Sequence, residues 1–195
     1  MYVKICGLRE PGHVATAVEA GADAIGFVMT RSPRRVTPER AAELAALVPE
    51  HVLTVGVFRG EDPETVRAAA LASGVRAVQL HGTHPHGDFT ALKDLGVTLI
   101  RAVAAQADLR CGAFDEDLLL VDAPHAGSGQ PWDWAAVRGR ATGRWLLAGG
   151  LAPGNVREAI EAADPWGVDV SSGLESAPGV KDPRLIEEFL RSVRG

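Results

Sequence analysis

The sequence predicts an α/β fold, a compact (β/α)8 barrel (TIM barrel) with short loops that spans residues 1–195 as a single domain. Short apolar runs rich in β-forming residues alternate with Ala-, Leu-, Glu- and Arg-rich stretches of helical period, as repeated βα units do. The alternation recurs eight times over 195 residues, and no linker or low-complexity tract interrupts it. Barrels of this class usually have about 250 residues, so the loops on the closed face must be short.

An open, doubly wound sheet is the alternative architecture. It normally has fewer strands, and a glycine-rich phosphate loop follows its first strand. Here the first strand runs into Cys6-Gly7-Leu8-Arg9, which lacks that fingerprint. The eight repeats therefore favour the closed barrel.

The individual elements follow from the apolar runs and from residues that begin or end helices. Capping residues precede four helical stretches, at Thr37, Asp62, Asp133 and Asp182, and glycines stand where three helices should stop. The fifth helix has the weakest pattern, because residues 104–114 show no clean period. Strands are expected at 3–6, 24–28, 53–58, 77–80, 98–103, 118–122, 145–148 and 167–171. Helices are expected at 11–20, 38–48, 63–73, 86–95, 108–115, 132–140, 153–163 and 183–193.

Composition indicates an ordinary globular protein of the reducing cytoplasm. The chain is 46% hydrophobic, has two cysteines and carries a net charge of −5, and it has neither a signal-like start nor a membrane-spanning run. Nucleic acid and membrane are therefore not expected as partners. A local cluster of Arg31, Arg34 and Arg35 suits a small anionic ligand. The sequence is compatible with a monomer or a homodimer.

Two reactive side chains, Cys6 and Asp122, stand where apolar strands stop. Either one alone would more often be a buried core cysteine or a helix-capping aspartate. Both at strand ends in one repeating chain favour chemistry, because the carboxyl ends of parallel strands form the active site of such barrels. A thiol with a pKa near 8.5 needs a nearby cation to act as a base. We expect Lys4, two residues before Cys6 on the same face, to supply it.

Period-two alternation sorts the strand residues into two faces. A charge against the helix layer is costly without a partner, so the polar faces should point into the barrel. A lower interior network is expected from Lys4, Gln79, Asp169 and Arg101. A layer at the rim is expected from Cys6, His81, Asp122 and Ser171.

The carboxyl-terminal quarter carries a phosphate signal. Gly149-Gly150 ends the seventh strand, and Ser171-Ser172-Gly173 ends the eighth. Small residues let backbone N–H groups approach a phosphate, and these two loops are the usual phosphate position of the fold. Plain tight turns would explain either sequence alone.

Other features are less specific. His81, His84 and His86 resemble a metal-ligand cluster, but they lie in a turn without an adjacent acidic residue, so no metal site is expected. His81 alone, at a strand end, is expected to touch a ligand. Arg34 suits a carboxylate. The loop 126–130 is either a cover for the substrate or a plain connection.

The ordered motifs together resemble the phosphoribosylanthranilate isomerase family of tryptophan biosynthesis. The resemblance covers almost the whole chain and departs from the family pattern at residues 29–31, at Ala126 and in the fifth unit. The matching pieces are Lys4-Ile5-Cys6-Gly7, 21–28, Ser32-Pro33-Arg34, 55–58, Val78-Gln79-Leu80-His81-Gly82, Gly127-Ser128-Gly129, Ala148-Gly149-Gly150-Leu151, 168–175 and Pro178-Gly179-Val180-Lys181-Asp182.

The resemblance implies an Amadori rearrangement of a phosphosugar substrate, N-(5′-phosphoribosyl)anthranilate, without metal or cofactor. It implies that Asp122 is the general acid and that Cys6, as thiolate, is the general base. By the same resemblance Arg34 holds the anthranilate carboxylate, and the turns at 149–150 and 171–173 bind the phosphate. Asp122 must then be protonated, so burial or nearby negative charge must raise its pKa.

Three other functions stay open at this point. A metal-dependent ribulose-phosphate-type epimerase would need ligands on several strand ends, where only His81 and Asp122 are available. A non-catalytic phosphate-binding barrel would need neither Cys6 nor Asp122. A bifunctional histidine- and tryptophan-pathway isomerase uses paired aspartates at the first and fifth strand ends, and Cys6 occupies the first of these positions here.

Overall fold

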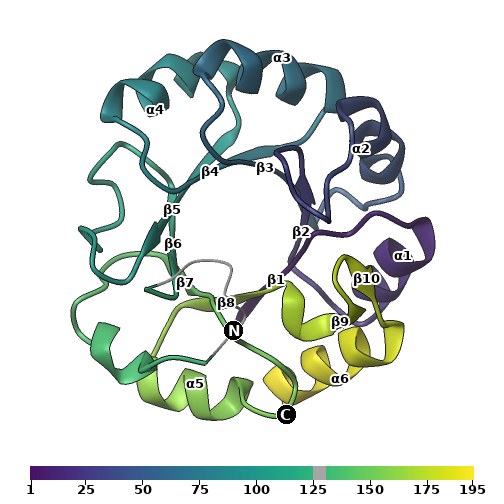
Figure 1. Cartoon of the computed structure of the whole chain (residues 1–195), viewed down its shortest axis with the longest axis vertical. Coiled ribbons are helices and arrows are strands. Elements are labelled where there is room, and N and C mark those ends of the chain that lie inside the picture. Colours follow the sequence, from purple (N-terminus) through teal and green to yellow (C-terminus); the bar gives the residue numbers. More distant parts are fainter. Residues whose placement is uncertain (125–130) are drawn as a thin grey trace.

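A computed structural model describes residues 1–124 and 131–195 of the chain. Eight parallel strands form a closed barrel in which each strand pairs with the next and β8 pairs with β1 (Figure 1), as predicted. The strands are β1 Tyr2–Cys6, β2 Ala24–Val28, β3 Leu53–Phe58, β4 Ala77–His81, β5 Thr98–Ala104, β6 Leu118–Asp122, β7 Trp145–Leu147 and β8 Gly167–Val170.

Helices surround the barrel, and sequence signals explain where several of them begin (Figure 1). Thr37, Asp62 and Asp182 each accept a backbone N–H of the following first turn, while Asp133 makes no such cap. The helices are α1 Pro11–Glu19, α2 Pro38–Ala45, α3 Pro63–Ser73, α4 His86–Leu92 with the 3-10 turn η1 Lys93–Leu95, α5 Val156–Ala163 and α6 Pro183–Arg194.

The fifth and sixth helical predictions are wrong. Residues 108–115 contain an isolated bridge at Arg110 and a turn over 111–114. No helix forms there, because Gly112 (φ 86°) and Asp115 (φ 63°) adopt left-handed backbone conformations that end a helix. In place of a helix over 132–140 there is one 3-10 turn, η2 Trp134–Val137. The helix expected from 153 begins only at Val156, because the Asn155 side chain instead bonds the Ala152 N–H and the Gly150 carbonyl.

Arg101 does not join the interior network that the sequence predicts. Its side chain leaves the barrel on the outer side and donates to Glu116 Oε1 at 2.7 Å. It also donates to the carbonyls of Asp108 (3.0 Å) and Arg110 (2.8 Å), and its guanidinium lies 4.9 Å from the Phe114 ring centroid. The buried pair thus organises the irregular segment after β5, whose carbonyls a helix would have used internally.

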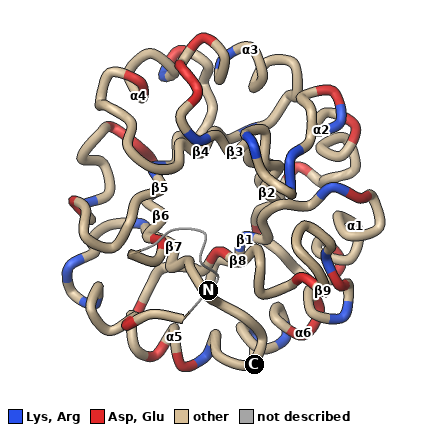
Figure 2. The backbone as a smooth tube through the Cα atoms, in the orientation of Figure 1, with Lys and Arg blue, Asp and Glu red and all other residues tan. Residues whose placement is uncertain are grey.

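Two apolar clusters build the molecule. The larger lies between strands and helices. The smaller fills the barrel and includes Cys6, Ile100, Leu120 and Leu146. Most charged residues lie in the surrounding loops and helices (Figure 2). The eight barrel strands contain four, Lys4, Arg101, Asp122 and Asp169, so charge inside the barrel is confined to few positions. No helix within the described residues is long and apolar enough to cross a bilayer.

A small hairpin follows β8 and was not predicted. After the 3-10 turn η3 Ser172–Leu174, strand β9 Glu175–Ala177 pairs with β10 Val180–Lys181 in an antiparallel two-stranded sheet. The hairpin lies outside the barrel beside β1 and α6 (Figure 1). It brings Glu175 and Lys181 to the open end of the barrel.

Candidate active site

The predicted site residues come together at the carboxyl ends of the strands. A cleft of about 120 Å³ lies there between the loops that follow β2, β6, β7 and β8. Asp122 stands at the end of β6 and Cys6 at the end of β1, with β7 and β8 between them. The cleft is lined by Arg34, Asp122, Ala148, Gly149, Gly150, Leu151, Asp169, Val170, Ser171 and Ser172.

Asp122 has the properties expected of a general acid. Its side chain is 13% exposed, and Oδ1 accepts the N–H of Ala123 at 2.8 Å. Burial raises the pKa of Asp122 to about 6, and the Asp169 carboxylate contributes to the increase, against the Ala123 hydrogen bond and the charge of Arg59. Both causes that the sequence argument required, burial and nearby negative charge, therefore act on this carboxyl group.

His81 lies beside the acid. Its Nε2 is 3.7 Å from Asp122 Oδ2, too far for a hydrogen bond. Burial and the charge of Arg59 lower the pKa of His81 to about 4. The imidazole is therefore neutral at pH 7 and can offer a hydrogen bond to a ligand without adding charge next to Asp122.

Cys6 lies below the rim and is buried. Burial raises the pKa of its thiol above the ordinary value, and Asp169 adds to this, although Lys4 and Lys181 both lower it. The expected help from Lys4 is thus present but is outweighed by burial. Lys4 Nζ also donates to Asp169 Oδ1 at 2.7 Å. The Asp169 carboxylate raises the pKa of both the Cys6 thiol and the Asp122 carboxyl group.

The turns after β7 and β8 lie against each other. A Cβ at Gly173 would collide with the carbonyl oxygen of Leu151, so only glycine allows this contact. Gly149 (φ 83°) and Gly150 (φ 69°) are both left-handed, and within the described residues their N–H groups donate to no protein acceptor. Adjacent turns with unused amides at the mouth of the cleft suit a phosphate.

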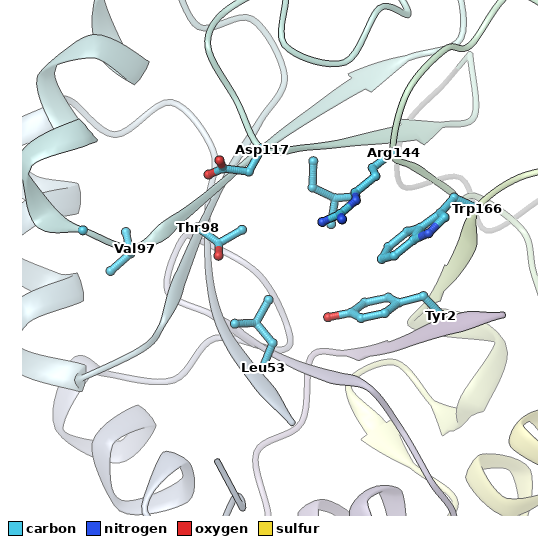
Figure 3. A pocket seen from close by; sticks show the side chains of 9 residues that line it. Tyr2, Leu53, Val97, Thr98, Asp117, Arg144 and Trp166 are labelled. Carbon is cyan, nitrogen blue, oxygen red and sulfur yellow. The ribbon is translucent and has the colours of Figure 1, made fainter. Parts of the chain in front are cut away.

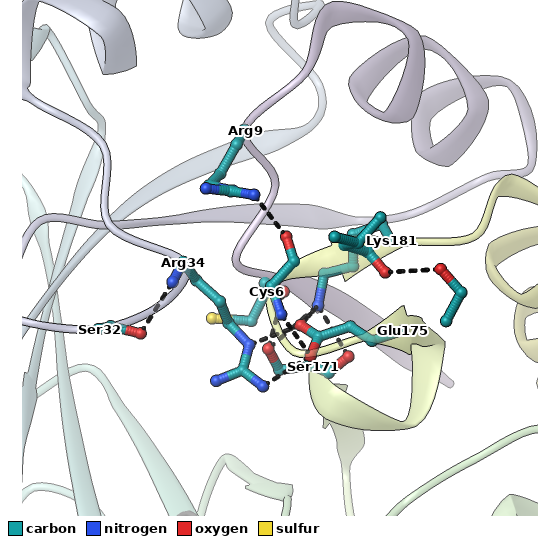
Figure 4. Close-up of polar contacts among 10 residues, drawn as sticks. Cys6, Arg9, Ser32, Arg34, Ser171, Glu175 and Lys181 are labelled. Carbon is teal, nitrogen blue, oxygen red and sulfur yellow. Dashed lines mark hydrogen bonds and ion pairs between the residues drawn. The ribbon is translucent and has the colours of Figure 1, made fainter.

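Arg34 is held by an ion pair at the edge of the cleft. Its Nε and Nη2 donate to the Glu175 carboxylate at 2.6 and 2.8 Å, and Lys181 donates to the same carboxylate at 2.9 Å. Figure 4 shows this cluster beside Cys6 and Ser171. Ser171 in turn donates its hydroxyl to the Cys6 carbonyl at 3.0 Å.

Comparison with known proteins decides the family. The model of the N-(5′-phosphoribosyl)anthranilate isomerase family matches residues 3–192. The isomerase of Geobacter sulfurreducens is 41% identical over 199 residues, which cover 99% of this chain and 98% of the relative. That of Paracoccus denitrificans is 43% identical over 203 residues, which cover 96% of this chain and 94% of the relative.

The chain belongs to the phosphoribosylanthranilate isomerase family. Among solved structures, TrpF from Jonesia denitrificans has 47% identity and a TM-score of 0.91 and covers 100% of this chain and 97% of its own. The isomerase from Thermotoga maritima has 35% identity and a TM-score of 0.87, with 100% and 99% covered. The (β/α)8 fold is therefore that of the family.

Sequence reasoning missed several residues at the site of this isomerase-family chain. Glu175 and Lys181 lie inside the matching motifs, yet nothing in their spacing indicated an ion pair with Arg34. Gly26 on β2 was also missed, although a Cβ there would lie 2.9 Å from Cys6 Sγ. Arg59, which acts on both His81 and Asp122, follows β3 without any motif. The loop 126–130, for which a substrate cover and a plain connection both stay open, lies outside the described residues.

The histidines near β4 have acidic partners that are distant in sequence or one turn away. His84 Nδ1 is 2.8 Å from Asp88, and His86 Nε2 is 2.9 Å from Asp115. In the described part of the chain, no group of three or more His, Cys, Asp or Glu side chains could hold a metal. The three histidines thus point to three separate carboxylates.

A larger cavity of about 460 Å³ lies at the opposite end of the barrel. Figure 3 shows Tyr2 stacked on Trp166, with Arg144 beside Trp166 and Asp117 across the opening. These residues stand at or before the amino ends of strands, whereas active sites of this fold lie at the carboxyl ends. The smaller cleft has the carboxyl group of raised pKa and two adjacent glycine-containing turns that suit a phosphate, so it is the candidate active site.

Proposed function

We propose that this chain, acting as one barrel domain over residues 1–195, rearranges N-(5′-phosphoribosyl)anthranilate to 1-(2-carboxyphenylamino)-1-deoxyribulose 5-phosphate in tryptophan biosynthesis. The observation that supports this proposal best is Asp122, whose pKa is raised to about 6. It stands at the end of β6, and the turns after β7 and β8, where we place the phosphate, lie between it and Cys6 on β1. A solved relative of 35% identity is a phosphoribosylanthranilate isomerase in complex with the reduced form of that product.

The first step opens the sugar ring. Protonated Asp122 donates its proton to the ribose ring oxygen, the bond between that oxygen and C1 breaks, and the anthranilate nitrogen lone pair forms an iminium ion. Asp122 is left as a carboxylate. Its raised pKa supports this role, because a carboxyl group with the ordinary pKa of 3.8 would rarely carry a proton at pH 7.

The second step moves the double bond. The Cys6 thiolate removes the proton from C2, and the released electron pair forms a C1–C2 double bond that neutralises the iminium nitrogen. The resulting enol then loses its hydroxyl proton and gains one at C1. C2 is oxidised to a ketone and C1 is reduced, so this aldose–ketose conversion is an intramolecular redox reaction that needs no external cofactor.

The remaining predicted residues bind the substrate. Arg34 has donors toward the cleft for the anthranilate carboxylate, His81 and Asp169 contact the sugar hydroxyls, and the phosphate lies on the adjacent turns. The residues of those turns are Gly149, Gly150, Ser171, Ser172 and Gly173.

The test is loss of substrate fluorescence with freshly prepared substrate and purified protein. Cys6→Ala and Asp122→Asn should each lower kcat by about a thousandfold or more while KM changes little, since both act only on the transition state. Turnover at the wild-type rate in either variant would contradict the assignment. Activity that chelators abolish and Cys6→Ser spares would support the metal-dependent epimerase instead. Sedimentation will distinguish a monomer from a homodimer, the state named for one relative.

A further inference from the structure

The hairpin β9–β10 brings the buried carboxylate of Glu175 to the candidate site. The proposed mechanism does not use this carboxylate. The Glu175 side chain is 5% exposed and that of Lys181 is 1% exposed. Glu175 accepts four hydrogen bonds, two from Arg34 (2.6 and 2.8 Å), one from Lys181 (2.9 Å) and one from the Gly179 N–H (3.1 Å). Every lone-pair direction of this carboxylate is therefore engaged.

We propose that Glu175 is a positioning residue, which fixes the Arg34 guanidinium for the ring carboxylate of the substrate, and that Lys181 fixes Glu175. This inference rests on the proposed function. Burial would raise the pKa of Glu175, but its hydrogen bonds with Arg34 and Lys181 hold that pKa at about 2. The carboxylate is thus ionised at every pH at which the enzyme would work.

The hydrogen-bond inventory of Arg34 supports a division of its two edges. A guanidinium has five N–H donors in a rigid plane. Glu175 takes one from Nε and one from Nη2, so three remain, on Nη1 and Nη2. Those two nitrogens form the end of the fork, which binds a second carboxylate with two parallel hydrogen bonds. In Figure 4 this free end points away from Glu175, and Arg34 lines the cleft.

Fixing the side chain lowers the cost of binding. Arg34 is 23% exposed, and a long side chain in that position loses rotamer freedom when it binds a ligand. With Glu175 in place, much of that freedom is already lost in the free protein. The hydroxyl of Ser171 and the backbone of Gly7 contact the same region, since a Cβ at Gly7 would lie 2.7 Å from Arg34 Cδ.

The cluster also sets the charge beside the thiol. The groups that act on Cys6 are Lys4, Asp169, Lys181 and Arg34, and Glu175 offsets part of the last two. Arg34, Lys181 and Glu175 together carry one net positive charge, whereas Lys4 and Asp169 cancel. That positive charge favours an anionic substrate without leaving two buried cations unpaired.

The test compares two ligands in the Glu175→Gln variant. One probe is the reduced product analogue, and the other is the same compound without the ring carboxylate. By calorimetry we expect Glu175→Gln to weaken the first by about tenfold to a hundredfold, the range of a lost charged hydrogen bond, and the second by less than about twofold. In kinetics KM should rise while kcat changes by less than about threefold.

Two controls make the result specific. Ser176→Ala, on the same strand β9, removes a hydroxyl whose hydrogen bond goes to the Val180 carbonyl and should change neither affinity. In an Arg34→Ala background, Glu175→Gln should cause no further loss, because a residue that acts through Arg34 has no effect without it.

Equal losses for both probes, or losses that add to those of Arg34→Ala, would overturn the proposal. If Glu175→Gln does not fold, Glu175→Asp carries the same comparison, since it keeps the charge and shortens the reach. The binding measurements do not depend on turnover. Wild-type protein that binds the probe without converting substrate would therefore refute the proposed function and leave the role of Glu175 measurable.

Discussion

The protonation states of Cys6 and Asp122 predict the pH dependence of the reaction. In the proposed mechanism the active form needs a protonated Asp122 and an ionised Cys6. Burial, with Asp169, raises the pKa of Asp122 to about 6, and burial raises the pKa of Cys6 above the ordinary value of a thiol. The acid therefore has the lower pKa and the base the higher, so most molecules of the free protein carry the opposite protonation pattern.

The size of the active fraction follows directly. At pH 7 roughly one tenth of Asp122 is protonated. Only a small share of Cys6 is ionised, because burial raises its pKa above the ordinary value, so few molecules have both groups in the active form. Between about pH 6 and the higher pKa of Cys6 the first share falls tenfold per unit while the second rises tenfold. We therefore expect kcat/KM to be level across this interval and to fall about tenfold per unit on either side.

A small active fraction is compatible with efficient catalysis. A carboxyl group with a pKa near 6 is a stronger proton donor than one with a higher pKa, and a thiolate with a high pKa is a stronger base. The gain in reactivity of each group offsets part of the loss in population. Asp169 links the two effects, because it raises both pKa values.

Both ionisations can be measured without substrate. The pH dependence of Cys6 alkylation, resolved by mass spectrometry with Cys111 as internal reference, gives the thiol pKa. Carbon-13 NMR of labelled aspartate gives the Asp122 pKa, the signal being identified by its loss in Asp122→Asn. Because substrate is absent, the two pKa values belong to the enzyme alone and are not confused with the ionisation of the substrate phosphate, which titrates near pH 6. A Cys6 pKa near 7, with kcat/KM falling already from pH 7 upward, would refute the reasoning.

Three substitutions test other parts of the structure. Gly149→Ala places a Cβ 2.7 Å from Asp122 Oδ1 at a left-handed position (φ 83°), and kcat should fall by about a hundredfold or more in the fluorescence assay. Glu116→Gln leaves the buried Arg101 guanidinium without its carboxylate and should cost about 3 kcal/mol of unfolding free energy in urea, with kcat/KM unchanged at 25 °C. Arg34→Ala should raise KM by about tenfold to a hundredfold; an unchanged KM would contradict its role.

The regular part of the fold was predictable because its signals are local. Each strand of the barrel is a short apolar run, and three of the four helices expected to be capped begin where a side chain accepts the N–H of the first turn. The failures lie where the stabilising contact is distant. The hydrogen-bond partners of Arg101 are Glu116 and carbonyls of a segment without helical or strand periodicity. The sequence pattern of that segment therefore did not indicate that it would supply them. Strand β5 has apolar residues on both faces, so alternation did not assign Arg101 to one of them.

The site divides in the same way. Alternation along single strands placed Cys6, Asp122 and Asp169 on the inner face, and the structure has them there, because the period of a strand fixes the direction of each side chain. The ion pair between Arg34 and Glu175 joins the loop after β2 to the hairpin after β8, 141 residues apart. Such a contact depends on how closure brings two distant loops together side by side, and the repeats that predict a closed barrel do not specify that contact. Arg34 and Glu175 both lie within motifs that resemble the family, but the motifs did not indicate that the two side chains form an ion pair.

Barrel closure also explains how one buried aspartate can influence both ends of the proposed reaction. The pairing of β8 with β1 sets Asp169 opposite Lys4, and their hydrogen bond of 2.7 Å keeps a charged pair beneath the cleft. From that position Asp169 raises the pKa of the thiol on β1 and of the carboxyl group on β6. An apolar floor would remove that influence from both groups. The polar floor of the barrel therefore helps to set their protonation and does not merely fill space.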